Sequence, residues 1–267
     1  MSLIEAFFLG LIQGFTEFLP VSSSGHLVLL QYFIGVKMPG ITFEVITHAG
    51  TLLSIVWVFW QDIYSLIKGI TNSARQQKLF LLLLAASLPA GFMGVFFISF
   101  FKGIFEKPQV VGLMLLCTGF IVFFIARLER VQGNRTLGEM KGKDAFIIGL
   151  FQAFAIIPGI SRSGSTIFGA LLQGLNRETA VRFSFLLALP AIAGATVLEL
   201  FNWLKIGSWP ENYLVYIIGA IVSFISGILA IRIFIRLLAG GKFYYFAYYC
   251  WLVGIFTILY LFLKSPV

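Results

Sequence analysis

The chain alternates long apolar runs with short polar connections, and these runs predict its helices. Hydropathy, taken together with the Gly, Pro, Ser and Asn residues that mark turns, divides the sequence into ten helical segments. Their approximate ranges are 3–19, 23–35, 44–62, 79–100, 109–127, 144–157, 163–175, 183–204, 213–236 and 243–263. The segments divide five and five, which indicates two related halves.

In each half the second segment is short and follows the first through Pro, Gly and Ser residues. A helix of about 13 residues rises only about 20 Å, which is too little to cross a hydrocarbon core of about 30 Å. We therefore expect residues 3–35 and 144–175 to form re-entrant hairpins, whose broken backbone has to lie against protein or a water-filled cavity. The other six segments are predicted to be full spans.

Two stretches of the sequence repeat one another. Residues 10–35 align without a gap on residues 149–174, with eight identical positions that include Gln13 with Gln152 and Ser22 with Ser161. A duplicated unit with an odd number of crossings places its second copy upside down in the membrane. The predicted fold is therefore all-α, an integral membrane inverted repeat of two five-helix units in one membrane domain. The units cover residues 1–127 and 144–263, and each is one re-entrant hairpin plus three transmembrane helices.

Basic residues predict the orientation of this fold. If the connection at 63–78 is cytoplasmic, thirteen Lys and Arg residues fall on the cytoplasmic side and five on the other side. The remaining one of the nineteen basic residues is Arg162, which lies within the repeat. Both termini and the first hairpin then face outward, the second hairpin enters from the cytoplasm, and the two tips can meet near the midplane. The thirteen are Lys68, Arg75, Lys78, Arg127, Arg130, Arg135, Lys141, Lys143, Arg177, Arg182, Arg232, Arg236 and Lys242, and the five are Lys37, Lys102, Lys107, Lys205 and Lys264.

Composition agrees with this pattern. With 59% hydrophobic residues, 11% charged residues and a mean hydropathy of +0.97, the chain cannot hide its apolar surface in a water-soluble core. The net charge of +8 comes from basic residues spread thinly between apolar runs, so we exclude a nucleic-acid partner. Cys117 and Cys250 match no metal or redox spacing. The first apolar run lacks the basic start of a signal peptide, and we expect it to be retained.

The tip of the first hairpin carries an acid, hydroxyls and a histidine. Gln13 and Glu17 lie four residues apart and share a helix face. Glu17 can be a general acid or base or a metal ligand in a wet cavity, or it can satisfy an interhelical hydrogen bond. Ser23 and His26 fall in the first turn of the next helix, where either can be a nucleophile with the other as its base. Ser22, Ser24 and Gly25 are further candidates for substrate binding, although helix capping alone also accounts for serines and glycine here.

The second tip supplies groups that bind an anion. Arg162 carries a planar fork that matches phosphate oxygens, and a second helix N-terminus follows it. Alternatively, Arg162 pairs with a buried acid such as Glu17 or Glu44 and joins the two halves, which is compatible with ligand binding. The two tips together predict a phosphate clamp. Its further candidate donors are Ser161, Ser163, Gly164, Ser165 and Thr166.

The third segment begins with a second candidate acid. Glu44 and His48 lie four residues apart on one face, and Glu44 is expected to border the cavity. We interpret His48 as an interhelical hydrogen-bonding residue rather than a catalyst. The sequence has no cluster typical of a structural metal site, although a divalent cation could bridge Glu17 and phosphate oxygens.

These motifs resemble the bacterial undecaprenyl-diphosphate phosphatases of the bacitracin-resistance type. The resemblance rests on Gln13-x-x-x-Glu17, on the run Phe-Leu-Pro-Val-Ser-Ser-Ser-Gly-His26 and on Pro158-Gly-Ile-Ser-Arg-Ser-Gly-Ser-Thr166, and it covers nearly the whole chain. It implies hydrolysis of the terminal phosphate of a C55 polyprenyl diphosphate, with Mg²⁺ or Ca²⁺, to regenerate the carrier lipid of peptidoglycan synthesis. It also implies bacitracin resistance and an inner-membrane protein whose site opens to the extracytoplasmic side.

The resemblance assigns active-site roles to Gln13, Glu17, Ser23, His26 and Arg162. Some members of the family have Glu where this chain has Gln13. Because Gln13 cannot be an anionic ligand, Glu17 is the expected metal ligand. The expected mechanism is phosphoryl transfer to Ser23, with His26 or Glu17 as its base, although attack by His26 or directly by water stays open. A flippase or secondary transporter on the same scaffold is the alternative, and a homodimer is possible.

Overall fold

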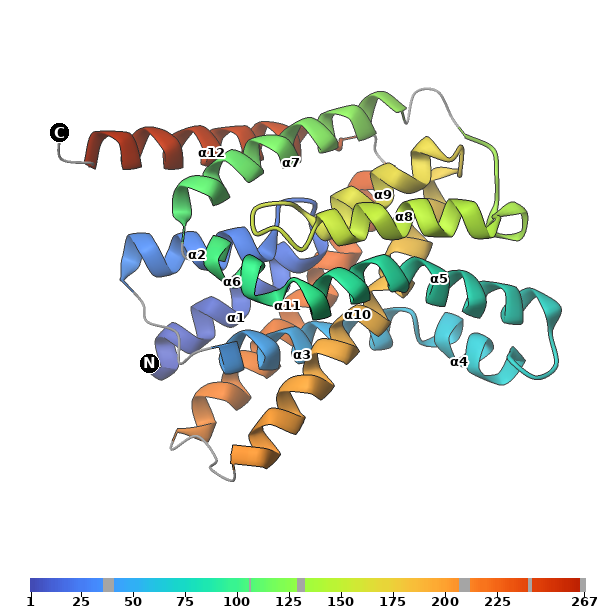
Figure 1. Cartoon of the computed structure of the whole chain (residues 1–267), viewed down its shortest axis with the longest axis horizontal. Coiled ribbons are helices and arrows are strands. Elements are labelled where there is room, and N and C mark those ends of the chain that lie inside the picture. The colour runs from blue at the N-terminus through green and yellow to red at the C-terminus, as the bar shows by residue number, and fades with distance from the viewer. Residues whose placement is uncertain (36–40, 106, 129–132, 207–211, 240–241, 265–267) are drawn as a thin grey trace.

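The protein is an assembly of helices. The computed structural model describes residues 1–35, 41–105, 107–128, 133–206, 212–239 and 242–264, and within them it has no β-strand, only one isolated bridge between Arg135 and Leu175. The helices are α1 (Leu3–Phe18), α2 (Ser23–Ile34), α3 (Ile41–Val58), α4 (Trp60–Gly69), α5 (Ala74–Phe96), α6 (Ile98–Phe105), α7 (Pro108–Leu128), η2 (Leu137–Glu139), α8 (Gly142–Phe154), α9 (Arg162–Leu172), α10 (Arg177–Ile206), α11 (Tyr213–Ala239) and α12 (Tyr244–Lys264). The all-α prediction is confirmed (Figure 1).

The helices identify a multi-pass membrane protein. Five of them, α5, α7, α10, α11 and α12, are long and apolar enough to cross a bilayer, and α3 with α4 makes a sixth span if the bent pair counts as one. Large apolar side chains cover their outer faces, for example Leu81, Leu252 and Phe262, which are 62%, 68% and 78% exposed. A surface of this kind is stable only against lipid.

The third predicted segment is wrong at its C-terminal end. We expected one helix over 44–62 followed by a loop to 78, but the chain bends by 79° between α3 and α4, and α4 continues to Gly69. The residue at the bend is Phe59, which caps α4 without a side-chain hydrogen bond. After Phe59, helix α4 is amphipathic. Its polar face carries Asp62 and Lys68, so this helix is less apolar than α3.

Other helix ends also differ from the prediction. Helix α5 begins at Ala74 and α10 at Arg177, five and six residues before the predicted starts. The added turns are polar and basic, and long basic side chains keep their charge in water while the backbone stays helical. Helix α6 occupies part of the predicted connection after residue 100. An apolar run therefore fixes where a span lies, but not where its helix ends.

The short helices of the two predicted hairpins lie within the bundle (Figure 1). Helix α1 packs on α11, and α8 packs on α5. Both crossings are close because they occur at glycine: a Cβ on Gly10 would lie 2.7 Å from the carbonyl oxygen of Gly219, and a Cβ on Gly149 would collide with the carbonyl oxygen of Ala86. Gly10 and Gly149 are equivalent positions of the sequence repeat, so both copies use the same device to admit a neighbouring backbone.

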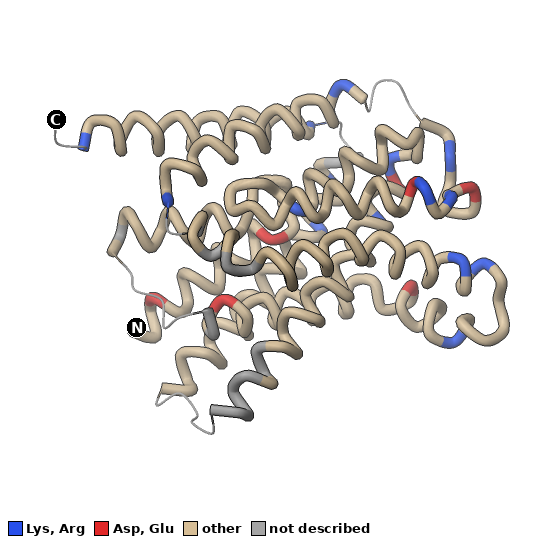
Figure 2. The backbone as a smooth tube through the Cα atoms, in the orientation of Figure 1, with Lys and Arg blue, Asp and Glu red and all other residues tan. Residues whose placement is uncertain are grey.

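Charged residues gather at one end of the molecule. Figure 2 shows most Lys, Arg, Asp and Glu residues at the end where α4 turns into α5 and where α8 begins. Two contacts there are the ion pair of Arg135 with Asp144, at 2.5 Å, and the hydrogen bond from Lys78 to the carbonyl of Gly138, at 2.6 Å. Lys78 and Arg135, which make these two contacts, are among the residues predicted to face the cytoplasm. Of the basic residues in that prediction, Lys37, Arg130 and the side chains of Lys102 and Lys205 lie outside the described residues.

Candidate functional site

The first tip connects α1 to α2 through a strained serine. Helix α1 ends at Phe18, and Ser22 caps α2 with a hydroxyl that accepts from the backbone N–H of Gly25 at 3.3 Å. Ser22 has φ 68° and ψ 98°, a conformation that costs a non-glycine residue about 1–2 kcal/mol. Such strain persists where the surrounding structure holds the backbone in place, and here it presents the start of α2 to α1.

The second tip repeats this helix cap but not the strain, because Ser161 has extended backbone with φ −76° and ψ 121°. Ser161, which is equivalent to Ser22, caps α9 with a hydroxyl that accepts from the N–H of Gly164 at 3.1 Å. The two tips touch each other at equivalent residues. A Cβ on Gly25 would lie 3.0 Å from the Cα of Gly159, and a Cβ on Gly164 would lie 3.4 Å from the Cβ of Pro20. The N-termini of α2 and α9 therefore meet, as the sequence predicts.

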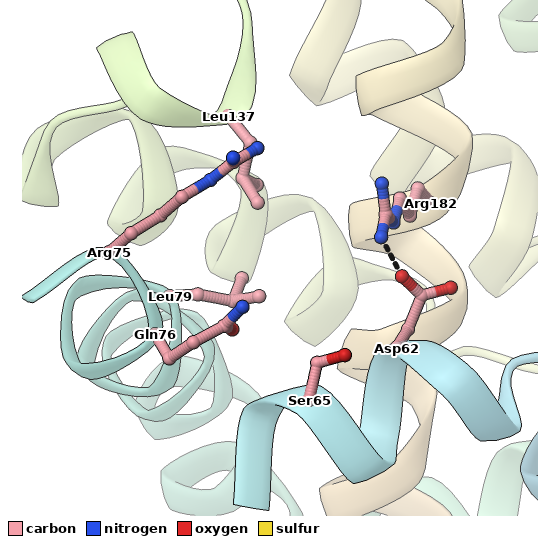
Figure 3. Close-up of a pocket in the computed structure, with 7 residues that line it drawn as sticks. All are labelled: Asp62, Ser65, Arg75, Gln76, Leu79, Leu137 and Arg182. Atoms are coloured by element: carbon pink, nitrogen blue, oxygen red, sulfur yellow. Dashed lines mark ion pairs between the residues drawn. The ribbon is translucent and has the colours of Figure 1, made fainter. Parts of the chain in front are cut away.

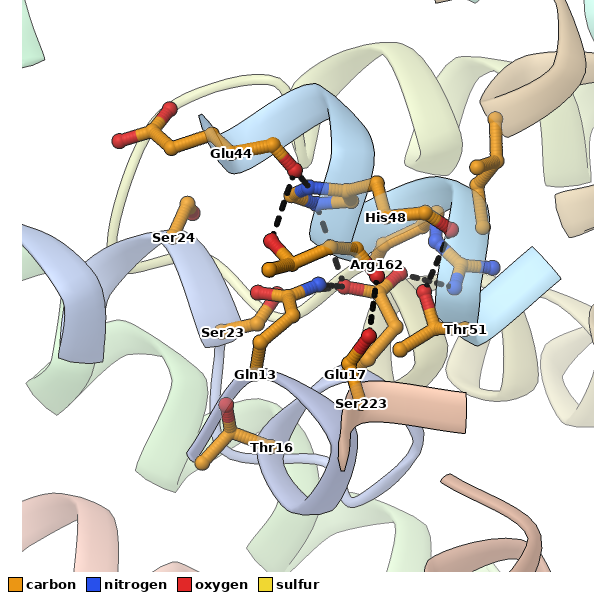
Figure 4. A network of polar contacts seen from close by, with 12 residues as sticks. Gln13, Thr16, Glu17, Ser23, Ser24, Glu44, His48, Thr51, Arg162 and Ser223 are labelled. Atoms are coloured by element: carbon orange, nitrogen blue, oxygen red, sulfur yellow. Dashed lines mark hydrogen bonds and ion pairs between the residues drawn. The ribbon is translucent and has the colours of Figure 1, made fainter. Parts of the chain in front are cut away.

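A buried carboxylate joins the two tips. Glu17 of α1 accepts a hydrogen bond from Ser23 Oγ at 2.6 Å and from Gln13 Nε2 at 3.0 Å, both on its Oε2 atom. Its Oε1 atom accepts from Arg162 Nη2 of the second tip at 2.7 Å. Figure 4 shows Glu17 between these partners, and the Glu17 side chain is only 5% exposed. Charge pairing within such a low-dielectric environment needs several good hydrogen bonds, and Glu17 has them.

A cavity of about 350 Å³ lies beside this carboxylate. Ala155, Ile156, Ala191, Ile192 and Ala195 form its apolar wall, so the cavity has a polar side and an apolar side. Seven of the predicted site residues line it: Glu17, Ser22, Ser23, Ser24, Glu44, Ser161 and Arg162. Its volume lies within the range of small-ligand sites.

Three buried polar atoms of the predicted site residues have no hydrogen-bond partner within the described residues. They are Nη1 of Arg162, Oε1 of Gln13 and Oγ of Ser165. A buried guanidinium N–H without an acceptor is costly, and it signals a ligand or water. Arg162 thus pairs with Glu17 through one nitrogen and keeps another donor for an anion.

His48 is a site residue that our sequence analysis did not assign to the site. Its Nε2 lies 3.4 Å from Oε2 of Glu17, and it lines the cavity (Figure 4). Its Nδ1 lies 2.7 Å from the backbone carbonyl of Glu44, which can only accept, so Nδ1 carries a proton. Nε2 then faces the carboxylate favourably only when a proton lies between them. The i, i+4 spacing of Glu44 and His48 was the one sequence signal for this placement.

His26 does not line the cavity that Ser23 lines, although the pair was expected to offer a nucleophile and its base. Its Nδ1 lies 2.7 Å from the carbonyl of Ser22, and its Nε2 lies 2.7 Å from the hydroxyl of Tyr249 on α12. The two rings stack with an angle of 4° between their planes. Because the Ser22 carbonyl only accepts, Nδ1 of a neutral His26 donates to it and Nε2 accepts from Tyr249. Both ring nitrogens are therefore engaged outside the cavity.

The remaining predicted residues support the tips from behind. Thr166 is fully buried, donates to the carbonyl of Arg162 at 2.9 Å and lies 2.5 Å from the Ser184 hydroxyl, so it does not reach the cavity. Ser163 donates to the carbonyl of Leu19 in the other tip at 3.3 Å. Gln13, Gly25 and Gly164 likewise contact the tips without lining the cavity.

Each tip is also held by a helix that contacts its loop carbonyl. Thr118 of α7 donates to the carbonyl of Gly159 at 2.7 Å and accepts from the N–H of Ser161 at 3.0 Å. Cys250 of α12 donates to the carbonyl of Pro20, which is the residue equivalent to Gly159, with a sulfur–oxygen distance of 3.7 Å. Cys250 therefore has a packing role, and α7 and α12 brace opposite tips at matching positions.

The arrangement around Glu17 does not fit a cation bound to that carboxylate. The described residues contain no group of three or more His, Cys, Asp or Glu side chains that could hold a metal ion. Donors from Gln13, Ser23 and Arg162 already occupy both oxygens of Glu17. Glu44 lines the same cavity and, among the described residues, its carboxylate accepts from Gln31 alone, at 3.4 Å, which makes Glu44 the more open carboxylate.

Comparison with known proteins gives a consistent family. The family described as bacitracin resistance protein BacA matches residues 6–256. A protein of Halothermothrix orenii named undecaprenyl-diphosphatase is 44% identical over 259 residues, which cover 97% of this chain and 98% of that protein. Proteins with the same name from Alkaliphilus metalliredigens and Methanococcus vannielii are 41% and 39% identical, each over 97% of this chain and over 99% and 100% of their own lengths. The resemblance stated from the sequence motifs is confirmed.

Proposed function

This chain belongs to the bacitracin resistance protein BacA family, and we propose that it is an undecaprenyl-diphosphatase. It removes the terminal phosphate of the C55 polyprenyl diphosphate, returns the carrier lipid to peptidoglycan synthesis and so confers bacitracin resistance. The observation that carries the proposal is the contact of Glu17 with a hydroxyl, Ser23, and with a guanidinium, Arg162, from opposite copies of one repeat. Nothing favours a flippase or transporter over this enzyme.

We propose that the diphosphate binds between the two tips. Arg162 offers its unpartnered Nη1, and the first N–H groups of α2 and α9 have no acceptor within their helices. Ser24 and Ser161 line the same cavity with hydroxyls. The apolar wall from Ala191 to Ala195 gives the prenyl chain a path away from these donors.

Ser23 is the proposed nucleophile. Its hydroxyl donates to Glu17, so the carboxylate is positioned to take the Ser23 proton as Oγ bonds to the terminal phosphorus and the bond to the bridging oxygen breaks. The prenyl monophosphate leaves, and water then hydrolyses phospho-Ser23 to release phosphate and restore the hydroxyl. Attack by His26 would first require its Nε2 to leave Tyr249.

His48 is proposed to hold the transferred proton. Its Nε2 faces Oε2 of Glu17, the oxygen that accepts from Ser23. A proton taken from Ser23 by Glu17 can therefore move to His48 without crossing the cavity. In this account His26 positions the start of α2 through Ser22 and Tyr249.

A Mg²⁺ or Ca²⁺ requirement stays a prediction. Since donors surround Glu17, we propose that any cation is held by Glu44 and phosphate oxygens rather than by Glu17 alone, and we base no step of the reaction on it. A homodimer also stays a prediction.

We propose that the fold is an inverted repeat of residues 1–127 and 144–263, with re-entrant hairpins and six spans in one domain. The support is a set of exchanged contacts. Helix α1 crosses α11 as α8 crosses α5, both at equivalent glycines, and each tip packs on the equivalent residue of the other. These exchanges are what a two-fold axis within the membrane plane produces.

The proposed location is the bacterial inner membrane, with the site opening to the extracytoplasmic side. A test replaces Cys117 and Cys250 with Ser and introduces one cysteine at the exposed Asn212 or Asn134. An impermeant thiol reagent added to intact cells should label Asn212→Cys and spare Asn134→Cys, because the basic end faces the cytoplasm. The reverse labelling would invert the topology.

Phosphate release tests the proposed activity. Purified protein in detergent should release inorganic phosphate from undecaprenyl diphosphate but not from the monophosphate, and Glu17→Gln should serve as the inactive control. If proteoliposomes move the lipid between leaflets without releasing phosphate, the protein is a carrier and the proposal is wrong.

A further inference from the structure

Three adjoining cavities surround Arg182 at the charged end of the molecule, away from the two tips. Their volumes are about 300, 710 and 180 Å³. Asp62 and Ser65 of α4 line the first and second, whereas Arg75 of α5 lines the first and third. We call them the arginine cavities, because Arg182 of α10 lines all three.

Charge in the arginine cavities favours an anion. Three arginines line them, Arg75, Arg177 and Arg182, against two carboxylates, Asp62 and Glu178. Arg182 is paired with Asp62, which neutralises that carboxylate (Figure 3). The Arg75 side chain makes no hydrogen bond or ion pair within the described residues, and it faces the same space from the other side. The cavities therefore carry one excess positive charge. The guanidinium of Arg75 is available to bind an anion.

Neutral donors and an apolar wall also line the arginine cavities. Ser65 and Gln76 line the first cavity and Thr179 the third. The second and largest cavity has an apolar side made by Phe59, Val181 and Ile235, of which Ile235 is 40% exposed. A free inorganic ion would gain nothing from that wall, whereas a lipid would place its phosphate at the arginines and its chain along the apolar side.

We propose that the arginine cavities bind the headgroup of an anionic phospholipid. The arginine fork is suited to two phosphate oxygens, and basic pockets between helices at a membrane surface are suited to anionic headgroups. The bound lipid would bridge α4, α5 and α10 beside the bend at Phe59, and would stabilise that junction. The inference does not rest on the proposed phosphatase activity.

The test compares lipids on delipidated full-length protein in detergent. Phosphatidylglycerol, phosphatidylcholine and inorganic phosphate are each added, and lipid retention by native mass spectrometry and the midpoint of thermal unfolding are measured. Phosphatidylglycerol should bind and raise Tm, while the other two should not. Inorganic phosphate that raises Tm as much as phosphatidylglycerol would contradict a lipid site, and equal retention of phosphatidylcholine would contradict an anion site.

Variants locate the binding. Arg75→Gln should weaken phosphatidylglycerol binding about tenfold, which is the loss expected for one charged hydrogen-bonding group. The matched control is Arg236→Gln, which makes the same charge change on α11. Arg236 is exposed and lines none of the three cavities.

Asp62→Asn should tighten binding of phosphatidylglycerol, because it removes the carboxylate that competes for Arg182. Phosphate release should be unchanged by Arg75→Gln. Equal binding by Arg75→Gln and Arg236→Gln would overturn the assignment.

Discussion

The two tips share a helix cap and differ in their chemistry. Ser22 and Ser161 cap their helices with the same hydrogen bond, at 3.3 and 3.1 Å, and both loops have a glycine at the fourth position of the motif. Where the copies diverge, Ser23 stands opposite Arg162 in the alignment and Glu17 stands opposite Ile156. The first tip carries the acid and the nucleophilic hydroxyl, and the second carries the cation.

This difference shows how a duplicated scaffold yields one asymmetric site. The shared caps and glycines fix where the helix ends meet, so the divergent side chains arrive at a common point. There Glu17 and Arg162 satisfy one another, which neither tip could provide alone. Removal of one member of a buried ion pair commonly costs about 3–5 kcal/mol, because it leaves an uncompensated charge.

The largest predicted effect is at the acid of the first tip. Glu17→Gln should lower kcat by about a thousandfold, since it removes the acceptor of the Ser23 proton. Gln13→Ala should lower kcat by about tenfold at most, because Gln13 contributes one neutral hydrogen bond to the same carboxylate. Turnover of both variants is measured at saturating substrate. Equal losses in kcat would refute this division between the two residues.

The next effect is at the cation of the second tip. Arg162→Lys keeps the charge but loses the fork that serves Glu17 and a phosphate oxygen together, so activity should fall at least about tenfold. Membrane insertion and the elution profile in detergent should stay normal, which separates catalysis from folding. Turnover near that of the wild type would mean that Arg162 acts only as a point charge.

The smallest effect is on the stability of the two equivalent helix crossings, α1 on α11 and α8 on α5. Gly10→Ala and Gly149→Ala should each lower the free energy of unfolding by about 1–3 kcal/mol, because each new methyl meets the backbone of a crossing helix. Thermal unfolding in detergent measures both, with Gly91→Ala as the control, since a Cβ on Gly91 meets no atom within 4 Å. Similar losses support equivalent scaffolds. A loss in only one copy would break the comparison.

Much of the site was predictable because local sequence encodes it. The repeat and its Pro, Ser and Gly residues identified both tips, and helical spacing put Gln13 and Glu17 on one face, where they hydrogen-bond. The alternative pairing of Arg162 with Glu17 was also stated from residue type, and it is present. A motif that caps its own helix and carries its own chemistry needs little tertiary information.

Other features depend on contacts between distant residues. His26 turns toward Tyr249, which lies 223 positions away, and no periodicity near His26 indicates this. His48 meets Glu17 only because α3 packs beside α1. The bend at Phe59 has no Pro or Gly within the break itself to mark it. Sequence reasoning therefore named the chemistry of the tips better than the partner of each histidine.

The most direct test of the central claim is rapid-quench labelling. The claim is that Ser23 of one tip and Arg162 of the other act on the same phosphorus. Undecaprenyl diphosphate with ³²P in its terminal phosphate is mixed with excess protein, quenched within milliseconds and mapped by peptide. We predict an acid-stable label on Ser23 that is absent from Ser23→Ala and formed more slowly by Arg162→Lys. An acid-labile label on His26, or no covalent label in a single turnover, would contradict the account.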